Sequence, residues 1–249
     1  MSILVTRPSP FGELLVKQLT EHGMDAYHTP LITFSPGDEL DKLAHYLTAM
    51  KSGDIVIAAS QHAVNYAKNK LAQDNYAWPE NINYLAIGYK TASVLQSALQ
   101  KATSSLVGYP QSREISEELL KLPQLQQVAG KKILILRGNG GREFLAEELK
   151  KQGADVIFCE CYQRHMINYD ASEICQRWQA LNIDRLVITS GEMLQHLYHL
   201  VPANYQQWLL SCRVIVVSER LAIMAKALGW TQCLIADNAD NDALLRALQ

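Results

Sequence analysis

The sequence has little of what would point to a metal site or a disulfide scaffold. Its five cysteines are an odd number, and none belongs to a C-x-x-C pair. Cys159 and Cys161 lie two residues apart in a strand-like run, a spacing that suits neither zinc nor a disulfide framework. We therefore expect reduced thiols that pack as small hydrophobic side chains.

Long apolar runs and an excess of charge are also missing. No apolar run approaches the roughly 18 residues that a membrane-spanning helix needs. The N-terminus lacks a basic region followed by a long apolar stretch, so we expect no signal peptide. The formal net charge is −2, which gives no global basic field to recruit nucleic acid. These absences predict a cytoplasmic protein that binds neither membrane nor nucleic acid.

Strong catalytic motifs are absent as well. The seven histidines form no H-E-x-x-H pattern, and His196 and His199 share a helix face without a third ligand nearby. No G-x-S-x-G marks a nucleophile elbow. The segment 137–142, Arg-Gly-Asn-Gly-Gly-Arg, is similar to a phosphate loop but fits neither G-x-G-x-x-G nor a P-loop. This favours chemistry that works by positioning a reactive substrate.

What the chain does contain is a regular alternation of strands and helices. Its 249 residues are 48% hydrophobic, enough for two domains of ordinary size. Short β-branched runs, such as 3–6, 25–34, 54–59 and 104–107, alternate with segments of helical period, such as 39–50. This alternation predicts parallel sheets with helices on both faces.

The chain also repeats itself at a shift of 130 residues. The shift places Ile3 on Ile133 and Arg7 on Arg137, with eight identities over positions 3–27 and no gap. The same shift aligns residues 54–60 with residues 184–190. One register that survives in separated segments predicts two copies of one five-stranded doubly wound unit.

Each copy contains one segment that is too long for an ordinary strand. Residues 25–36 and 155–167 begin as strands and run on beyond the usual five or six residues. In one interpretation the two segments pair as an antiparallel connector between two globular halves. In the other, 29–37 is a loop, because two prolines and a glycine lie in it. The periodicity of the sequence does not decide between them.

Small polar residues and glycines follow the predicted strands, where helices begin. In open parallel sheets, ligands bind beyond the carboxyl ends of the strands, where helix N-termini present free N–H groups and partial positive charge. A single such junction is more often a plain helix cap than a binding site. Two sheets with several junctions each could nevertheless face one cleft and hold a polyanion at many points. The cations at these junctions are Arg7, Lys90, Arg113, Arg137, Arg142 and Arg220.

Several short segments, taken in order, carry a resemblance to a known family. They are ILVTRP at 3–8, SQHAV at 60–64, AIGYKTA at 86–92, YP at 109–110, ILRGNGGRE at 135–143, CYQR at 161–164, ITSG at 188–191 and VSER at 217–220. In this order and spacing the chain resembles uroporphyrinogen-III synthases, and it is similar to the enterobacterial type over essentially its whole length.

That resemblance implies an α/β fold of two similar doubly wound, flavodoxin-like domains joined by a two-stranded antiparallel connector. In the family the chain crosses between the lobes. Lobe one would be residues 1–28 and 168–249, and lobe two would be residues 38–157. The connector strands would be residues 29–37 and 158–167.

The resemblance also implies a reaction. The family closes hydroxymethylbilane, a linear tetrapyrrole with eight carboxylates, into uroporphyrinogen III, on the way to haem and sirohaem. Water is lost and ring D is inverted through a spiro intermediate, and no cofactor or metal takes part. The substrate left alone closes without inversion to the type I isomer, so orientation should supply most of the selectivity.

The site residues are carried over position by position from the same resemblance. Tyr162 matches the family's connector tyrosine, expected to donate a hydrogen bond or a proton to the leaving hydroxyl; its alternative role is packing within the connector. Residues 218–221, Ser-Glu-Arg-Leu, depart from the Gly-x-Thr pattern often seen in the family, so positions 220 and 221 offer no side-chain hydroxyl and Arg220 would substitute by charge. The expected substrate-binding residues are Arg7, Ser60, Gln61, Lys90, Thr91, Arg137, Gly138, Asn139, Arg142, Thr189, Ser190, Gly191, Ser218 and Arg220.

Two other functions fit parts of the sequence. One is a two-lobed binding module for a small polyanionic ligand, against which the missing signal peptide counts. The other is a nucleotide-dependent transferase that uses residues 137–142, but it lacks a magnesium-binding carboxylate pattern. For the synthase, the expected partners are the linear tetrapyrrole and, transiently, hydroxymethylbilane synthase. We expect a monomer, because two lobes alone could build the site.

Overall fold

The computed structural model describes residues 2–99, 106–141 and 143–249, and its strands form two five-stranded sheets. The chain divides into two compact units. Unit 1 is Met1–Thr33 with His165–Gln249, and unit 2 is Phe34–Arg164. The predicted α/β class with two mostly parallel sheets is therefore confirmed, whereas the finer bounds of lobes and connectors stay a prediction. Within the described ranges, no helix is long and apolar enough to cross a membrane.

The sheet of unit 1 has the strand order β10-β9-β8-β1-β2, with all neighbours parallel. Its strands are β1 (Ser2–Val5), β2 (Asp25–His28), β8 (Ile183–Val187), β9 (Arg213–Val216) and β10 (Cys233–Ile235). Its helices are α1 (Phe11–Glu21), α7 (Ala171–Ala180), α8 (Gly191–Leu200), α9 (Ala203–Ser211), α10 (Glu219–Ala227) and α11 (Asn241–Leu248). β1 is buried along its whole length, as expected for a strand with helices on both faces.

The sheet of unit 2 has the order β3-β7-β6-β4-β5. Its strands are β3 (Ile32–Pro36), β4 (Ile55–Ala58), β5 (Asn83–Ala86), β6 (Lys132–Gly138) and β7 (Asp155–Met166), of which β3 and β7 also reach into unit 1. Its helices are η1 (Leu40–Lys42), α2 (Leu43–Thr48), α3 (Gln61–Gln73), α4 (Tyr89–Leu99), α5 (Ser116–Leu119), η2 (Pro123–Leu125) and α6 (Phe144–Lys151).

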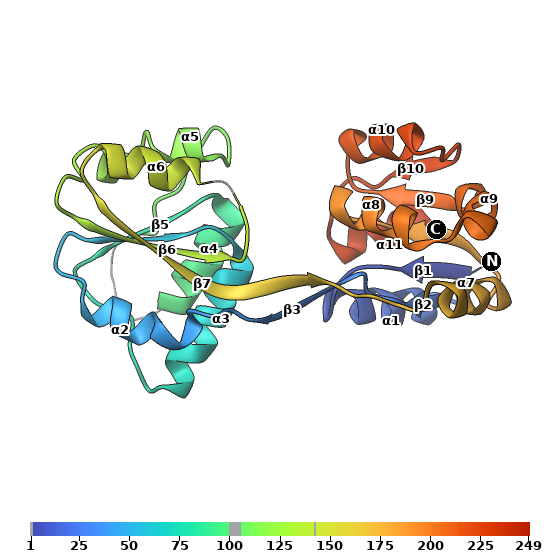
Figure 1. Cartoon of the computed structure of the whole chain (residues 1–249), viewed down its shortest axis with the longest axis horizontal. Coiled ribbons are helices and arrows are strands. Elements are labelled where there is room, and N and C mark those ends of the chain that lie inside the picture. Colours follow the sequence, from blue (N-terminus) through green and yellow to red (C-terminus); the bar gives the residue numbers. More distant parts are fainter. Residues whose placement is uncertain (1, 100–105, 142) are drawn as a thin grey trace. The chain divides into compact units, whose positions relative to one another are not determined.

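Alternate residues of the unit 2 strands feed two separate cores. Ile55 and Ile57 of β4 pack with α5 and α6, whereas Val56 and Ala58 pack with α2, α3 and α4. The same helices lie on opposite sides of the sheet in Figure 1. Because both faces of β4 pack against apolar side chains, all four of its residues are buried and it reads as a continuous apolar run.

The sequence repeat and the structural units do not coincide. By the shift of 130 residues, β4, α3, β5 and α4 correspond to β8, α8, β9 and α10, and β1 and β2 correspond to β6 and β7. Unit 1 therefore combines the first two strands of repeat one with the later strands of repeat two, and unit 2 combines the complementary pieces. Equivalent strands nevertheless occupy equivalent places in the two sheet orders.

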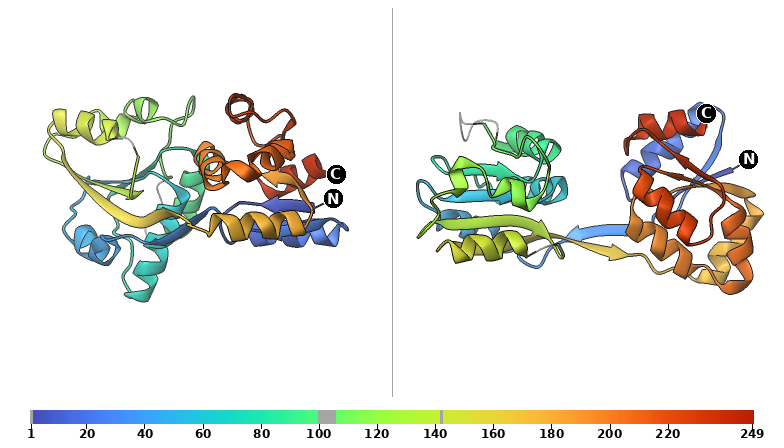
Figure 2. Two further views of the ribbon diagram at one scale, coloured as in Figure 1. Left: turned by 45° about the vertical axis from the view of Figure 1, so that its right-hand side comes forward. Right: turned by 90° about the horizontal axis from the view of Figure 1, so that it is seen from above.

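The two long segments behave differently from each other. β7 is one strand of 12 residues. The prediction of a single strand over 25–34 is wrong at residues 29–31, because β2 ends at His28 and β3 begins at Ile32. Pro30 lies in that break and has no N–H to donate to a ladder. β3 lies beside β7 and antiparallel to it: the Ile167 amide donates to the Leu31 carbonyl, and the Gly37 amide donates to the Cys161 carbonyl (Figure 2). The loop interpretation of 29–37 therefore fits only its first residues.

Two further predictions need adjustment, and one helix was missed. The predicted helix 39–50 begins as the short 3₁₀ segment η1 before α2. The predicted strand 104–107 begins outside the described residues, and the described part of that region makes a single parallel bridge, between Leu85 and Gly108. Helix α9 was not predicted.

Candidate active site

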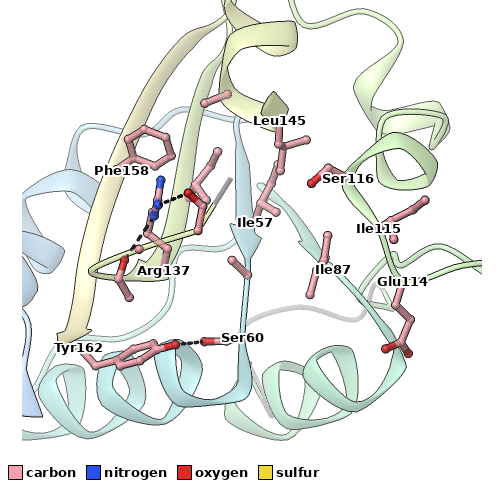
Figure 3. A pocket seen from close by; sticks show the side chains of 16 residues that line it. Ile57, Ser60, Ile87, Glu114, Ile115, Ser116, Arg137, Leu145, Phe158 and Tyr162 are labelled. Atoms are coloured by element: carbon pink, nitrogen blue, oxygen red, sulfur yellow. Dashed lines mark hydrogen bonds between the residues drawn. The ribbon is translucent and has the colours of Figure 1, made fainter. Parts of the chain in front are cut away.

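The candidate site of unit 2 lies where the sheet changes its direction of winding. β4 and β6 are neighbours, but the chain leaves β4 toward β5 and leaves β6 toward β7, on opposite sides. Such a switch point opens a crevice beyond the carboxyl ends of the two strands. A pocket of about 310 Å³ lies there, lined by Ser60 after β4 and by Arg137 and Gly138 at the end of β6 (Figure 3).

Tyr162 enters this pocket from the neighbouring strand because β7 carries one extra residue. Up to Arg137, which pairs with Glu160, the register of β6 and β7 is regular; Gly138 then pairs with Tyr162. The register shift is a bulge at Cys161, and a bulge of this kind re-aims the side chain that follows it. The Tyr162 ring thus lies half-buried at the pocket wall.

The Tyr162 ring packs directly against the backbone of Gly138. A Cβ at position 138 would lie 2.6 Å from Cζ and 2.8 Å from Cε2 of Tyr162, closer than carbon atoms can approach. Only glycine leaves room for the ring.

Ser60 connects the phenol to a helix start. Its backbone is extended, its Oγ accepts the Ala63 amide at 3.1 Å as the N-cap of α3, and its hydroxyl donates to Tyr162 Oη at 3.3 Å. Figure 3 shows the two side chains meeting at one edge of the pocket. The cap interaction is the one expected of serine at a helix start.

Three aromatic rings surround the other side of Tyr162. Phe34 stacks on His62 with ring centroids 4.2 Å apart, and the Tyr162 centroid lies 5.7 Å from that of Phe34 and 5.5 Å from that of His62. Tyr66 stacks against Tyr162 at 6.0 Å. Burial, together with the positive charge of Arg164, lowers the pKa of His62. The imidazole is therefore neutral at pH 7, and the rings form an uncharged wall.

Arg137 braces the glycine-rich loop of the pocket. Its Nε donates to the Gly138 carbonyl at 3.3 Å and its Nη2 donates to the Gly141 carbonyl at 3.2 Å. The guanidinium carbon lies 4.5 Å from the centre of the Phe158 ring, and the side chain is only 12% exposed. Glu143 lies 3.8 Å away from Nη1. Several of the N–H groups of Arg137 thus already donate to carbonyls of its own loop.

Asn139 is also occupied by the backbone. Its Nδ2 donates to the Arg164 carbonyl, its Oδ1 accepts the Arg164 amide, and its own amide donates to the Tyr162 carbonyl. It extends the pairing of β6 with β7 beyond the bulge. Arg142, also predicted to bind substrate, lies outside the described residues.

A carboxylate of the protein itself covers the start of α4. Glu114 lines the pocket, and its Oε1 accepts the Tyr89 amide at 2.8 Å. A Cβ at Gly88 would clash with that carboxylate, so glycine makes room for it. Of the residues predicted at this junction, Lys90 is exposed on α4, whereas Thr91 is 6% exposed and faces the core.

The remaining predicted residues divide between the two units. Gln61 is the exposed first residue of α3. In unit 1, Ser190 and Ser218 cap α8 and α10 by accepting the amides of Met193 and Leu221. Gly191 is buried, Thr189 is half-buried and Arg220 is exposed on α10.

Arg7 in unit 1 is held by neighbours of its own unit. Its guanidinium donates to Asn241 at the start of α11 and lies 5.6 Å from the centre of the Phe11 ring. Burial lowers the pKa of Arg7, opposed by the negative charge of Asp240. The structure therefore gives Arg7 a partner in the first residue of α11, which the strand-end pattern did not suggest.

The sequence did not single out the residues that surround Tyr162. The residues around the ring and along the pocket come from four segments: Phe34 from β3, His62 and Tyr66 from α3, Phe158 from β7 and Glu114 from the segment before α5. The β3–β7–β6 pairing and the bulge bring Tyr162 to them. His62 lay within a quoted motif, which was its one signal. Among the described residues no cluster of three or more histidine, cysteine or acidic side chains could hold a metal ion.

Known proteins resemble the chain over its whole length. The family model described as uroporphyrinogen-III synthase HemD matches residues 13–246. The chain is 55% identical over 250 residues to the uroporphyrinogen-III synthase of Escherichia coli (strain K12), covering 100% of both chains. It is 54% identical over 250 residues to that of Salmonella typhimurium, again covering 100% of both.

A solved structure supports the fold. A mutant uroporphyrinogen III synthase from the extremely thermophilic bacterium Thermus thermophilus superimposes with a TM-score of 0.62 at 14% identity, covering 100% of this chain and 99% of that chain. At this identity the likeness concerns the fold alone.

Proposed function

The chain belongs to the uroporphyrinogen-III synthase family, and we propose that it cyclises hydroxymethylbilane to uroporphyrinogen III with inversion of ring D. The observation that carries this proposal is the 55% identity to the Escherichia coli synthase over the full length of both chains. The enzyme is a hydro-lyase, since the hydroxyl of the hydroxymethyl group leaves as water while its carbon becomes the last bridge of the ring.

Tyr162 is the proposed hydrogen-bond donor or acid. The electron-rich pyrrole expels the hydroxyl and becomes an electrophilic azafulvenium cation, and the departing oxygen takes a proton to become water. Tyr162 Oη lies at the pocket wall beside the glycine-rich end of β6, where it can supply that proton. The proton that the substrate releases when the ring is complete then restores the phenol, so no net proton is consumed.

Helix starts are the proposed binding groups for the substrate carboxylates. Three of these helices begin with a serine cap whose hydroxyl oxygen accepts the third amide of the helix: Ser60, Ser190 and Ser218. The first two amides of each helix remain for a ligand. Amides suit this task because their dipoles attract carboxylates over a wide pH range without titrating. The other predicted binding residues keep the same proposed role: Arg7, Gln61, Lys90, Thr91, Arg137, Gly138, Asn139, Arg142, Thr189, Gly191 and Arg220.

The proposal also covers the cellular location, the partner and the oligomeric state of the enzyme. All five cysteines are free, and four of them are buried, as suits a reducing cytoplasm. The substrate closes on its own to the wrong isomer, so rapid transfer from hydroxymethylbilane synthase would preserve it. We expect the enzyme to act as a monomer.

The product isomer tests the proposed function. Hydroxymethylbilane is generated in situ, the protein is added, and the oxidised porphyrins are resolved by chromatography. Type III porphyrin in excess over a protein-free control is the expected result. Type I porphyrin alone, from correctly folded protein, would exclude the synthase and favour a binding module for a polyanionic ligand.

A further inference from the structure

The hydrogen bonds of Ser60 fix the direction in which its hydroxyl points. Its Oγ already accepts the Ala63 amide at 3.1 Å, because Ser60 is the N-cap of α3. A serine hydroxyl has one proton and two lone pairs. Within the part of the chain that the structure describes, Tyr162 Oη, 3.3 Å away, is the acceptor recorded for that proton.

This assignment leaves the proton of Tyr162 free. A phenol oxygen that accepts from Ser60 keeps its own O–H for another partner. If the bond ran the other way, both lone pairs of Ser60 would be filled and the serine proton would lose the acceptor recorded for it. The contact is longer than the usual 2.7–2.8 Å of O–H···O bonds, as is common in catalytic sites before substrate binds.

We propose that Ser60 is a positioning residue, which accepts from the start of α3 and donates to Tyr162 so that the phenolic proton faces the pocket. The inference rests on the proposed function, because it assumes that this proton assists the leaving hydroxyl. It changes the expected role of Ser60, from a contact of the substrate carboxylates to a support of the acid.

The surroundings hold both partners in this geometry. Ser60 has an extended backbone (φ −162°, ψ 158°) between the end of β4 and the first turn of α3. The Tyr162 ring is confined between Gly138 on one side and the rings of His62 and Tyr66 on the other. The phenol therefore has little freedom except rotation of its O–H, and the bond from Ser60 sets that rotation.

Two nearly isosteric substitutions separate the cap from the donor. Asparagine and aspartate are both good N-caps, so Ser60→Asn and Ser60→Asp both preserve the start of α3. Asparagine keeps an N–H that can donate to Tyr162 Oη, whereas aspartate can only accept and would draw the phenolic proton away from the pocket. We expect Ser60→Asn to keep kcat within about threefold and Ser60→Asp to lower kcat by about tenfold or more. Equal kcat values for the two variants would overturn the proposal.

The kcat at saturating substrate is the quantity to compare, because a new negative charge also weakens binding of carboxylates and raises KM. In the background of Tyr162→Phe, the Ser60→Asp substitution should cause no further fall in kcat, since the two residues act as one unit. A full additional fall would show that Ser60 acts independently of Tyr162 and would overturn the inference.

A cap of unit 1 controls for stability. Asp170 caps α7 by accepting the Glu173 amide at 2.9 Å. Asp170→Ala and Ser60→Ala each remove a cap and should each lower the unfolding midpoint, but only Ser60→Ala should lower kcat. If Asp170→Ala lowered kcat as much as Ser60→Ala, loss of stability would explain both, and the positioning role would be refuted.

The outcomes also separate this inference from the proposed function. If wild-type protein forms type III porphyrin but Tyr162→Phe has the wild-type kcat, the role of Ser60 is refuted and the synthase stands. If wild-type protein forms no type III porphyrin, the proposed function itself is refuted.

Discussion

Four neighbours that take no part in the proposed chemistry hold Tyr162 in place. Gly138 gives the ring a floor without a side chain, Ser60 contacts its oxygen, and the His62 and Tyr66 rings limit its movement. A reactive group held in this way loses little entropy when substrate arrives. Changes at these neighbours should therefore alter the rate of reaction before they abolish the fold.

The smallest such change is Gly138→Ala. The new Cβ would lie 2.6 Å from Tyr162 Cζ, so the ring must move. We expect kcat to fall by about tenfold, because a displacement of about 1 Å in a catalytic group is costly. Steady-state kinetics measure this.

Gly140→Ala is the matched control for stability. It adds a Cβ that meets nothing within 4 Å, so its unfolding midpoint should stay at the wild-type value. A wild-type kcat in Gly138→Ala would show that the position of the ring is unimportant.

The lowered pKa of His62 should make the free energy of unfolding depend on pH. Burial and the charge of Arg164 lower its pKa below the ordinary value of 6.5. The unfolded chain therefore binds a proton at His62 at a higher pH than the folded chain does. Stability from this residue is present above pH 6.5 and is lost as the pH falls toward the folded pKa.

Urea unfolding between pH 7.5 and about 5 tests this prediction. His62→Phe keeps a ring against Phe34 but removes the titration, so its stability should fall less steeply with pH. His45→Gln removes an exposed histidine of unit 2 and serves as the control. Parallel curves for wild type and His62→Phe would be inconsistent with a half-buried imidazole whose pKa is lowered by the fold.

At the scale of elements, the site is a set of strand ends and the loop that follows β6. The loop is shaped by Arg137, which bonds two of its carbonyls and stacks on Phe158 of β7. Glu114 covers the start of α4 in the same pocket. The start of α4 thus already has a carboxylate of the protein as its partner, unlike the helix starts at which we propose that substrate carboxylates bind.

Arg137→Ala should raise KM by about tenfold, because the loop amides lose their brace and the pocket loses a cation. Stability should fall by about 1–2 kcal/mol, from the lost hydrogen bonds and the lost contact with Phe158. Lys150→Ala removes an exposed cation from α6 and should change neither quantity. A lower stability with unchanged KM would make Arg137 a purely structural residue.

The sequence predicted the individual helices and strands better than the contacts between elements that are distant in the chain. Local features can be recognised in the sequence itself. Examples are the apolar runs of β1, β4 and β6 and the serine caps of α3, α8 and α10. The bulge at Cys161 and the break at residues 29–31 depend on pairing between distant strands, which periodicity does not report. The environment of Tyr162 follows from that pairing, so Phe34 and Tyr66 carried no signal.

At the scale of the molecule, a repeated sequence has been distributed over two sheets. Repeat one supplies β1 and β2 to unit 1 and β4 and β5 to unit 2. The alignment at a shift of 130 residues revealed the repeat, but its division between the units came from the family resemblance and not from the repeat itself. Each unit keeps the same winding, and so each has a switch point where strands of different repeats meet.

We propose that Tyr162, held at the switch point of unit 2, assists departure of the hydroxyl. Single-turnover kinetics of wild type and Tyr162→Phe with hydroxymethylbilane test it most directly. We predict that the variant folds, still forms type III porphyrin, and reacts about tenfold or more slowly. The loss should not exceed the usual 10²–10⁴-fold of general acid catalysis, because this hydroxyl also departs unaided. A single-turnover rate equal to that of wild type would contradict the account.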